Sequence, residues 1–561
     1  MENIAITQKT KEVFPELSIM KARRYDSLFK GRNLPSFVRD YILRRFTDND
    51  GVVDEKAVNN YLDTKMPSDS EILKQRLLNG ESVNITTRFT VSTDMALGRV
   101  RFHMPDVGIS SNAYVSQELL EKTEDPLTDG EHWGNITLVY VEPQGKRKGY
   151  ALMTSYKSFD PYRIDLSYYL EARQNFTTEE WIDFLVAAME YNPDEFSEEQ
   201  KYEVIARLLP LVEPRLNMIE LGPKGTGKSY VYNNLSKYAW LLAGGRTTRA
   251  KLFYNKATRQ FGVMKNYDVV GIDEITTFQF SDPDEMQSIM KSFLEAGKAA
   301  VDNVMFQSEC GLILMGNIPL DKDMKPLNPS YVKNLPEMFR ESATMDRFHG
   351  FIEGWKLPRL SKDHIIEGWV LNCEYFSSVL HMLRFSSEYD GVFSELVDIP
   401  HGCDLRDKKA VQRLATAYHK LLFPHIHSLS DIEPDQVDTF KLLYDRYCLQ
   451  PAIYRRQIIR DQCHRIDKEF KPEVSAFSVI GLPDGTDSVE SPMEESNEIY
   501  FEDNEPVVEE SIENETLENE IVEEKSVGDE LTEDDSAQED PVVEEYDEEE
   551  ETEEVSNAYV M

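Results

Sequence analysis

Eight consecutive residues have the types and spacing of a loop that binds the phosphates of a nucleotide. Residues 222–229 read Gly-Pro-Lys-Gly-Thr-Gly-Lys-Ser and fit G-x-x-x-x-G-K-[S/T] without a mismatch. Glycines let backbone N–H groups curl around a phosphate, and the following helix turns its positive N-terminus toward it. Lys228 is expected to reach the β- and γ-phosphates and Ser229 to ligate Mg²⁺. The residues predicted to bind the nucleotide are Gly222, Pro223, Lys224, Gly225, Thr226, Gly227, Lys228, Ser229 and Tyr230.

Polar residues end two later apolar runs that are expected to lie beside this loop. Residues 267–274 read Tyr-Asp-Val-Val-Gly-Ile-Asp-Glu, and residues 311–317 read Gly-Leu-Ile-Leu-Met-Gly-Asn. Buried parallel strands are short apolar runs, and their C-terminal ends open at the phosphate-binding edge of the sheet. Asp273 is predicted to hold the magnesium ion through water, Glu274 to polarise the attacking water, and Asn317 to orient it. An exposed strand end and a simple turn are the plain alternatives.

Two arginines are candidates for contacts with the transferring phosphoryl group. Arg347 follows Asp346 and is expected to reach the nucleotide of a neighbouring subunit, where a cation stabilises the transition state. Arg340 competes for this role, and a surface ion pair between Arg347 and Asp346 is the alternative. Arg406, at the start of a predicted helix, is expected to lean over the bound nucleotide, with Arg413 as the other candidate.

The elements that must position these groups alternate between strand and helix, which predicts an α/β domain with a parallel sheet. We expect this domain to cover residues 196–358 and a helical lid to cover residues 359–470. Strands are expected at 218–221, 238–243, 267–272 and 311–317, helices at 230–239, 248–258 and 284–296, and a hairpin at 298–306.

The N-terminal 82 residues form a predicted helical segment with a strongly basic stretch at 20–46. This stretch contains eight Lys or Arg residues and two Asp residues. Such a stretch is either a solvated face or a surface that contacts DNA phosphates. The candidate DNA contacts in this segment are Arg23, Arg24, Lys30 and Arg32. The interleaved aromatic residues recur at helical spacing, which favours core positions for Tyr25, Phe29, Phe37, Tyr41 and Phe46.

The hydrophobic period changes to two after residue 82, which predicts a small β-barrel or sandwich domain over residues 83–195. Its strands are expected at 83–91, 98–104, 135–142 and 149–156, and a helix at 177–188 closes it. The turn at 145–149 is basic and adds Lys146, Arg147 and Lys148 to the candidate DNA contacts.

Bulk composition places the acidity of the chain in its last 71 residues. Residues 491–561 hold 30 Asp and Glu residues against one Lys, and removing them changes the net charge from −41 to −12. The acidity therefore does not exclude nucleic acid as a partner, and residues 471–561 are predicted to be a disordered acidic tail. The five scattered cysteines indicate reduced thiols, and we see neither a signal peptide nor a membrane span.

The order of phosphate loop, Asp273–Glu274, Asn317 and Arg347 resembles the AAA+ class of P-loop ATPases, in the branch that contains MCM helicases and Lon proteases. Longer strings carry a closer resemblance, to the BrxL family of Lon-like ATPases from bacterial BREX phage-defence systems. These strings are 220–229, 244–248, 252–255, 267–274, 315–318 and 345–355.

The resemblance implies a cytoplasmic, ring-forming ATPase that uses ATP and Mg²⁺ and engages double-stranded DNA in anti-phage defence. It implies a homo-hexameric ring, either single or stacked, other defence proteins as partners, and no membrane. It also implies that the 298–306 hairpin lines the pore, with Lys298 as a candidate DNA contact. Longer members carry a Lon-like protease domain. Nothing past residue 470 is expected to fold into one, so peptidase activity is not expected here.

Three functions compete at this point. The first is a motor that translocates on or remodels DNA, and the second is a protein-remodelling ATPase without its own peptidase. The third is an ATP-gated assembly switch, which the Asp273–Glu274 pair disfavours. Basic pore residues would favour the DNA motor, whereas Phe278 and Phe280 keep the protein remodeller open.

Overall fold

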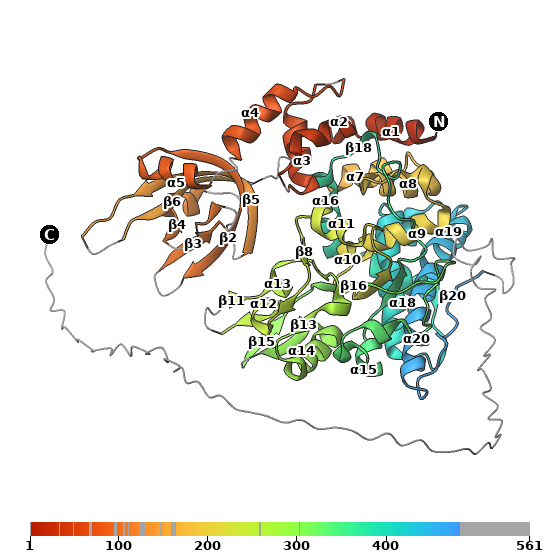
Figure 1. Ribbon diagram of the computed structural model, residues 1–561. Helices are drawn as coiled ribbons and strands as arrows, with labels where there is room; N and C mark the ends of the chain where they lie inside the picture. The colour runs from red at the N-terminus through yellow and green to blue at the C-terminus, as the bar shows by residue number, and fades with distance from the viewer. Residues whose placement is uncertain are drawn as a thin grey trace, which may run out of the picture. The chain divides into compact units, whose positions relative to one another are not determined.

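Figure 1 shows the computed structural model of the 561-residue chain. The structure describes residues 2–482 apart from the positions 33, 49, 67–69, 95–97, 105–106, 110–111, 123–126, 128–129, 146–147, 159–163, 257–259 and 302. Most of the predicted acidic tail, and Lys146 and Arg147 of the basic turn, therefore lie outside the described residues.

A five-stranded parallel sheet forms the centre of the nucleotide-binding region. In chain order its strands are β7 (Met218–Gly222), β8 (Ala239–Leu242), β12 (Val269–Ile272), β16 (Gly311–Asn317) and β17 (Gly350–Glu353). In space the order is β17-β7-β16-β12-β8, with every pair parallel. Four of the five strands are almost fully buried, as is usual for the strands of a parallel sheet. Because β7 lies next to β16, and β16 next to β12, the phosphate loop, Asn317 and Asp273 follow neighbouring strands.

The connections between these strands are helical, but two differ from expectation. The helix after the phosphate loop consists of α11 (Lys228–Tyr230) and one π-helical turn (Val231–Leu235). The helix expected over 248–258 is only α12 (Arg249–Leu252), because a short strand, β10 (Tyr254–Asn255), follows at once.

The predicted helix and hairpin ahead of β16 are present. Helix α14 (Pro283–Ala296) begins at Asp282, whose side chain accepts a hydrogen bond from the N–H of Glu285. It ends at Gly297, whose φ of +68° turns the chain into strands β14 (Lys298–Val301) and β15 (Val304–Gln307). A Cβ at Gly297 would lie 2.7 Å from the Ser308 carbonyl oxygen, so this turn requires glycine.

The N-terminal segment packs into the same hydrophobic core as the ATPase region. Helices α1 (Glu2–Val13) and α3 (Ser36–Arg45) flank strand β1 (Ser18–Lys21), which pairs with β18 (Gly368–Leu371). The predicted core aromatics Tyr25, Phe29 and Phe37 are at most 6% exposed within this cluster.

Residues 83–158 form a closed five-stranded barrel with its own core. Its strands are β2 (Val83–Asp94), β3 (Arg99–His103), β4 (Ala113–Val115), β5 (Gly130–Val141) and β6 (Tyr150–Ser158), and helix α6 (Gln117–Lys122) follows β4. Strand β4 was not expected, because three residues carry too little alternation to be recognised. The helix expected to close this domain, α8 (Thr178–Ala188), belongs instead to the core shared by the N-terminal segment and the ATPase region.

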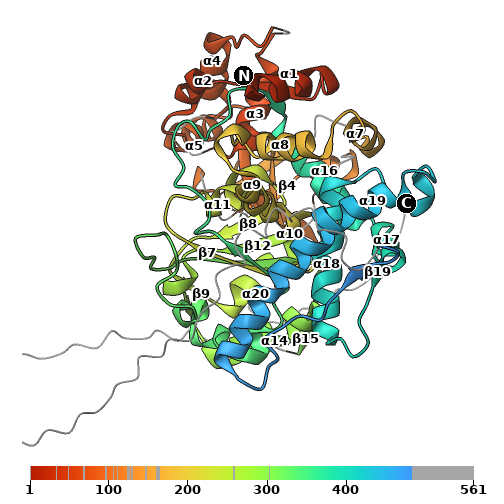
Figure 2. The ribbon, with the colours of Figure 1, turned by 90° about the vertical axis from the view of Figure 1, so that its right-hand side faces the viewer.

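The C-terminal helices pack against the ATPase sheet. Helices α16 (Cys373–Phe385), α18 (Leu405–Leu422) and α20 (Gln450–Ile466) follow β18, and α18 lies along α20 in Figure 2. The tail does not begin at residue 471 as predicted, because β20 (Ser478–Val479) pairs with β19 (Val397–Asp398) and Phe477 is buried. Among the described residues no helix is both long and apolar enough to cross a membrane.

Candidate active site

The phosphate loop has a backbone path that only glycine permits at several positions. Gly225 and Gly227 have φ angles of +88° and +79°. A Cβ at Gly222 would lie 2.5 Å from the carbonyl carbon of Gly354, and one at Gly227 would lie 2.5 Å from the hydroxyl of Tyr191. The loop backbone can therefore approach a bound phosphate closely, and it leads directly into the N-terminus of α11. This is the arrangement that binds an anionic phosphate.

Lys228 lies beneath the loop with its ammonium group held by neutral oxygens. Its Nζ donates hydrogen bonds to the Pro223 carbonyl at 2.6 Å and to Oδ1 of Asn317 at 3.1 Å. The side chain is buried, and this burial lowers the pKa of the ammonium below its ordinary value. The structure thus brings Lys228 and Asn317 together, as the sequence predicts for residues that face the γ-phosphate.

Ser229 and Asp273 also meet. The Ser229 hydroxyl donates a short hydrogen bond to the Asp273 carboxylate, whose other oxygen accepts from the N–H of Glu274 at 2.8 Å. A hydroxyl and a carboxylate are the oxygen ligands that Mg²⁺ prefers, so these residues fit the ion. Glu274 has a left-handed backbone with φ of +51° and an exposed side chain. That conformation carries its carboxylate toward Gly244, where a Cβ would lie 3.3 Å from Oε2.

A buried ion pair that the sequence analysis missed supports the loop from below. Arg207 donates to Glu220 of β7 at 2.6 Å and to the Thr226 carbonyl of the loop at 3.0 Å. Both charged side chains are at most 1% exposed. A single arginine inside an apolar helix gives no recognisable pattern, because its partner is defined only by the folded sheet.

Arg359 is a second cation that sequence reasoning did not assign to the loop. The side-chain carbon Cγ of Arg359 would lie 3.2 Å from a Cβ built at Gly225. The N–H of the next residue, Leu360, donates to the Gly225 carbonyl at 2.9 Å. The segment after β17 therefore covers one side of the phosphate loop.

A cavity of about 550 Å³ opens beside the loop. Tyr191, which contacts the Gly227 carbonyl at 3.5 Å, and Tyr230, which directly follows the loop, both line it. Apolar side chains from the N-terminal segment and from the chain after β17 complete its walls, among them Phe29, Leu360 and Ile366. Its position and its apolar walls suit the base of a nucleotide whose phosphates occupy the loop.

The floor of this cavity is a buried charged cluster centred on Glu190. Glu190 has a φ of +68° and accepts hydrogen bonds from Tyr230, from Lys21 at 2.6 Å and from Ser36 at 2.8 Å. Burial alone would lower the pKa of Lys21, but Asp40 and Glu190 together raise it above its ordinary value. The cluster links the N-terminal segment to the residue that follows the phosphate loop.

Arg347 and Arg406 gather in a separate place, the arginine cluster, with the carboxylates of Glu295 and Asp346. Arg347 lies 3.2 Å from Glu295, and Arg406 lies 3.1 Å from Glu295 and 2.9 Å from Asp346. Neither partner of Arg406 belongs to the phosphate loop, so a contact between Arg406 and a bound nucleotide stays a prediction. The alternative Arg413 contacts Glu213.

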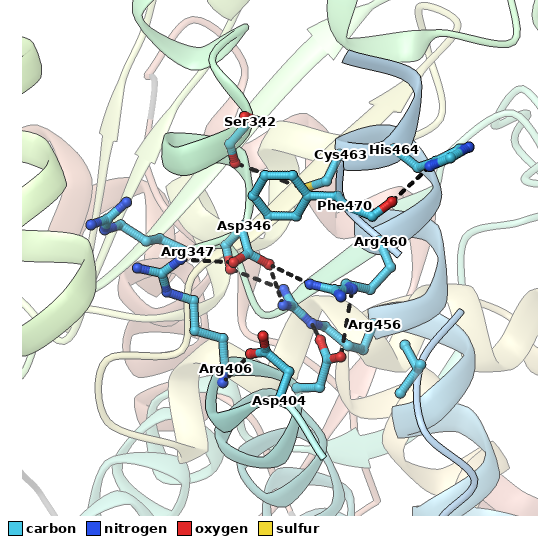
Figure 3. A network of polar contacts seen from close by, with 12 residues as sticks. Ser342, Asp346, Arg347, Asp404, Arg406, Arg456, Arg460, Cys463, His464 and Phe470 are labelled. Atoms are coloured by element: carbon cyan, nitrogen blue, oxygen red, sulfur yellow. Dashed lines mark hydrogen bonds and ion pairs between the residues drawn. The ribbon is translucent and has the colours of Figure 1, made fainter. Parts of the chain in front are cut away.

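Helix α20 holds the arginine cluster from inside the protein. Figure 3 shows Asp346 among Arg347, Arg406, Arg456 and Arg460. Arg456 contacts Asp346 at 2.6 Å and is fully buried. Burial would raise the pKa of Asp346, but Arg456 and Arg406 lower it below its usual value, so Asp346 is ionised. The competitor Arg340 donates to the Leu335 carbonyl at 2.6 Å and does not join the cluster's described contacts.

The candidate DNA contacts differ in whether their side chains already form contacts within the protein. Arg32 bonds to Asp63 at 2.9 Å and to two backbone carbonyls, and Arg23 pairs with Glu367 at 2.9 Å, which favours structural roles. Arg24 donates to the hydroxyl of Tyr25 at 2.6 Å. The candidates Lys30, Lys148 and Lys298 are exposed.

Comparisons with known proteins match both the ATPase region and the N-terminal region of the chain. A model for the ATPase domain of BrxL-like Lon-like proteases matches residues 151–476, and a model for the N-terminal region of the BREX-system protein BrxL matches residues 12–140. The chain is 27% identical to the Lon-like protease BrxL of Escherichia coli O9:H4 (strain HS) over 78% of its length, and 27% identical to that of Bacillus cereus (strain H3081.97) over 71%. These matches cover 62% and 59% of the two relatives, so the chain spans about three-fifths of their length.

Proposed function

Because the chain belongs to the BrxL family and carries its ATPase domain, we propose that it is an AAA+ ATPase of bacterial phage defence. In this proposal a homo-hexameric cytoplasmic ring, alone or stacked on a second ring, binds double-stranded DNA. ATP hydrolysis drives its movement along that DNA or its remodelling, together with other BREX proteins.

The observation that carries the proposal is the meeting of three strand ends. Lys228 contacts Asn317, and Ser229 contacts Asp273. In both pairs the two residues are far apart in the sequence. The spatial order β17-β7-β16-β12-β8 sets β7, β16 and β12 side by side, which supports the proposed AAA+ domain. This order brings the groups for phosphate, magnesium and water to one edge of the sheet.

Each group then has a defined role toward bound ATP. The loop N–H groups and Lys228 hold the β- and γ-phosphates, and Ser229 and Asp273 hold Mg²⁺, which supplies positive charge to the transferring phosphoryl group. Glu274 polarises the water that attacks the γ-phosphorus, and Asn317 orients that water. The cavity between Tyr191 and Leu360 receives the base.

The arginine cluster completes the site of the neighbouring subunit in this proposal. Arg347 and Arg406 share the partner Glu295 and have no described contact with the loop of their own chain. In a ring the same face lies against the next subunit, where either guanidinium can stabilise the charge that develops on the phosphoryl oxygens.

DNA is favoured over a polypeptide as the substrate in the pore. Phe278 and Phe280, which kept the protein remodeller open, are at most 8% exposed and pack in the core. They do not supply the aromatic pore surface that a polypeptide motor needs. Lys298, at the start of the β14–β15 hairpin, is exposed and carries the charge that a DNA phosphate needs.

Steady-state ATP turnover with and without double-stranded DNA tests the proposal. We expect DNA to stimulate turnover, and Glu274→Gln to abolish both basal and stimulated turnover while ATP binding remains. Glu337→Gln, which changes an exposed glutamate outside the site, is the matched control. Turnover that ignores DNA would contradict the DNA motor, and turnover that survives Glu274→Gln would contradict the assigned chemistry.

A further inference from the structure

The barrel of residues 83–158 has a strand topology that is associated with the binding of oligomeric ligands. Its order is β2-β3-β4-β6-β5, with β5 returning to β2, and the third and fifth strands pair in parallel. Helix α6 lies between the third and fourth strands in the chain. This is the topology of an OB-fold, a barrel whose outer face over the second and third strands binds oligonucleotides and oligosaccharides. The corresponding strands here are β3 and β4.

Two tyrosines and two arginines gather on the outer face of β3, β4 and the neighbouring strand β6. Ala113 and Val115 of β4 point into the barrel core, so Tyr114 between them points outward. The rings of Tyr114 and Tyr150 meet edge to face, with centroids 5.4 Å apart. The guanidinium of Arg99 lies 5.1 Å from the Tyr114 ring centre, and that of Arg101 lies 6.0 Å from it. We call these four residues the tyrosine–arginine face.

The tyrosine–arginine face borders a cavity of about 430 Å³. Arg99 and Lys148 bring two positive charges to its lining, against the one negative charge of Glu142. Asn112 and Gln144 add amide groups that both donate and accept hydrogen bonds. In nucleic-acid sites, aromatic rings stack on the bases, cations contact the phosphates, and amides form hydrogen bonds with the base edges.

We infer that the tyrosine–arginine face binds single-stranded nucleic acid. An unpaired base stacks on Tyr114 or Tyr150, and Arg99 and Lys148 contact the neighbouring phosphates. Duplex bases are stacked on one another and cannot offer their faces to these rings. The site is therefore distinct from the pore contacts proposed above. The inference does not depend on whether DNA drives ATP hydrolysis.

The charge of the site decides between the two ligand classes that OB-folds bind. A neutral oligosaccharide needs hydrogen bonds and stacking, but no pair of exposed cations. Arg99 and Lys148 are both exposed, and neither lies in a hydrophobic core. Their charge complements a phosphate backbone, so nucleic acid is the occupant to which the inference commits.

Fluorescence anisotropy of a labelled oligothymidylate, titrated with the full-length protein without nucleotide, tests the inference. Because one stacked base contributes a factor of about 5 to 150 in affinity, we expect Tyr114→Ala to weaken binding about tenfold. Adding Tyr150→Ala should weaken it further, whereas Tyr114→Phe should keep most of the affinity. Lys122→Ala removes a charge from the same barrel on α6, outside the face, and should have little effect.

Salt dependence gives a second readout that a purely structural role would not change. Arg99→Ala and Lys148→Ala should each reduce the slope of log affinity against log salt by about one. Unchanged basal ATP turnover would show that each variant is folded.

Three results would overturn the inference. The first is equal competition by an unlabelled duplex of the same length. The second is an equal effect of Tyr114→Ala and Lys122→Ala, and the third is the absence of oligothymidylate binding. A failure of DNA to stimulate ATP turnover, by contrast, would contradict only the proposed function.

Discussion

The phosphate loop and the arginine cluster both collect cations near the central sheet, but they neutralise them differently. Lys228 rests on neutral acceptors, the Pro223 carbonyl and the Asn317 amide oxygen. Arg347 and Arg406 instead rest on carboxylates, and they share Glu295. The loop therefore keeps positive charge ready for a phosphate within one chain. The arginines must exchange a carboxylate for a phosphate before they can act.

In the proposed ring, this difference separates a site that is complete within one chain from one that needs a second subunit. A cation held by dipoles gains a full charge–charge interaction when a phosphate arrives. A cation held by a carboxylate gains only the difference between its interaction with the phosphate and its interaction with the carboxylate. Stabilisation of the phosphate by such a cation therefore depends on how closely the neighbouring subunit approaches. The following predictions test this comparison, from the largest expected effect to the smallest.

The phosphate loop should lose the most when its cation is removed. Lys228→Ala should lower ATP turnover about a thousandfold, since one aligned electrostatic group contributes about 10²–10³ or more. Lys224→Ala removes an exposed lysine from the same loop and should cost far less. Steady-state turnover at saturating ATP measures both. Equal losses in the two variants would show that general charge, and not position, matters in the loop.

The ion pair below the loop should matter mainly for stability. Arg207→Met leaves Glu220 charged and unpaired in a buried site, so we expect the free energy of unfolding to fall by about 3 kcal/mol. Replacing both residues, as Arg207→Met with Glu220→Met, should restore much of that loss. Denaturant unfolding measures the change. A double variant as unstable as the single one would mean that the hydrogen bond to Thr226 dominates.

The arginine cluster should behave as a part of the neighbouring site. Arg347→Ala should lower turnover about a hundredfold, because it removes one stabilising group from the transition state. ATP binding to the separated subunit should not change. Arg340→Ala, in the same segment, is the matched control and should leave turnover near the wild-type value.

Mixing two inactive variants tests the contribution between subunits directly. Lys228→Ala subunits retain Arg347, and Arg347→Ala subunits retain Lys228, so mixed rings contain some complete sites. Turnover should reappear on mixing. Mixtures that stay inactive would place the action of Arg347 within its own subunit.

The shared carboxylate should have the smallest effect. Glu295→Gln removes the charge that both arginines contact, and partly exposed ion pairs contribute at most about 1 kcal/mol. We therefore expect the protein concentration at half-maximal turnover to fall about threefold. Turnover measured over a dilution series checks this. A higher concentration requirement would mean that Glu295 holds the arginines in their active geometry.

The sequence predicts the parts of the site that lie in continuous strings. Ser229, Asp273 and Asn317 each end a strand or begin a helix, and local rules place them at the same edge of a parallel sheet. Arg207, Glu190 and Arg359 escape such rules, because their partners come from distant segments of the chain. The helix that carries Arg406 was recognised, but the contacts of Arg406 with Glu295 and Asp346 depend on the packing of distant segments and could not be predicted.

In the fold, too, features with a clear local pattern were predicted and features without one were missed. The parallel sheet and most barrel strands follow from their periodicity, whereas the three-residue strand β4 does not. The basic stretch at 20–46 was predicted to be a solvated face or a surface that contacts DNA phosphates. In the structure, Lys21 of that stretch is partly buried and pairs with Asp40 and Glu190.

The Glu190 cluster also bears on how such a protein can change over generations. The two matched family regions end and begin at residues 140 and 151, but Lys21 and Asp40 lie on one side and Glu190 and Tyr230 on the other. A recombination event that exchanged one region between relatives would inherit half of a buried charge network. The two regions must therefore descend together, or each substitution in the network must be answered by a compensating one across the boundary.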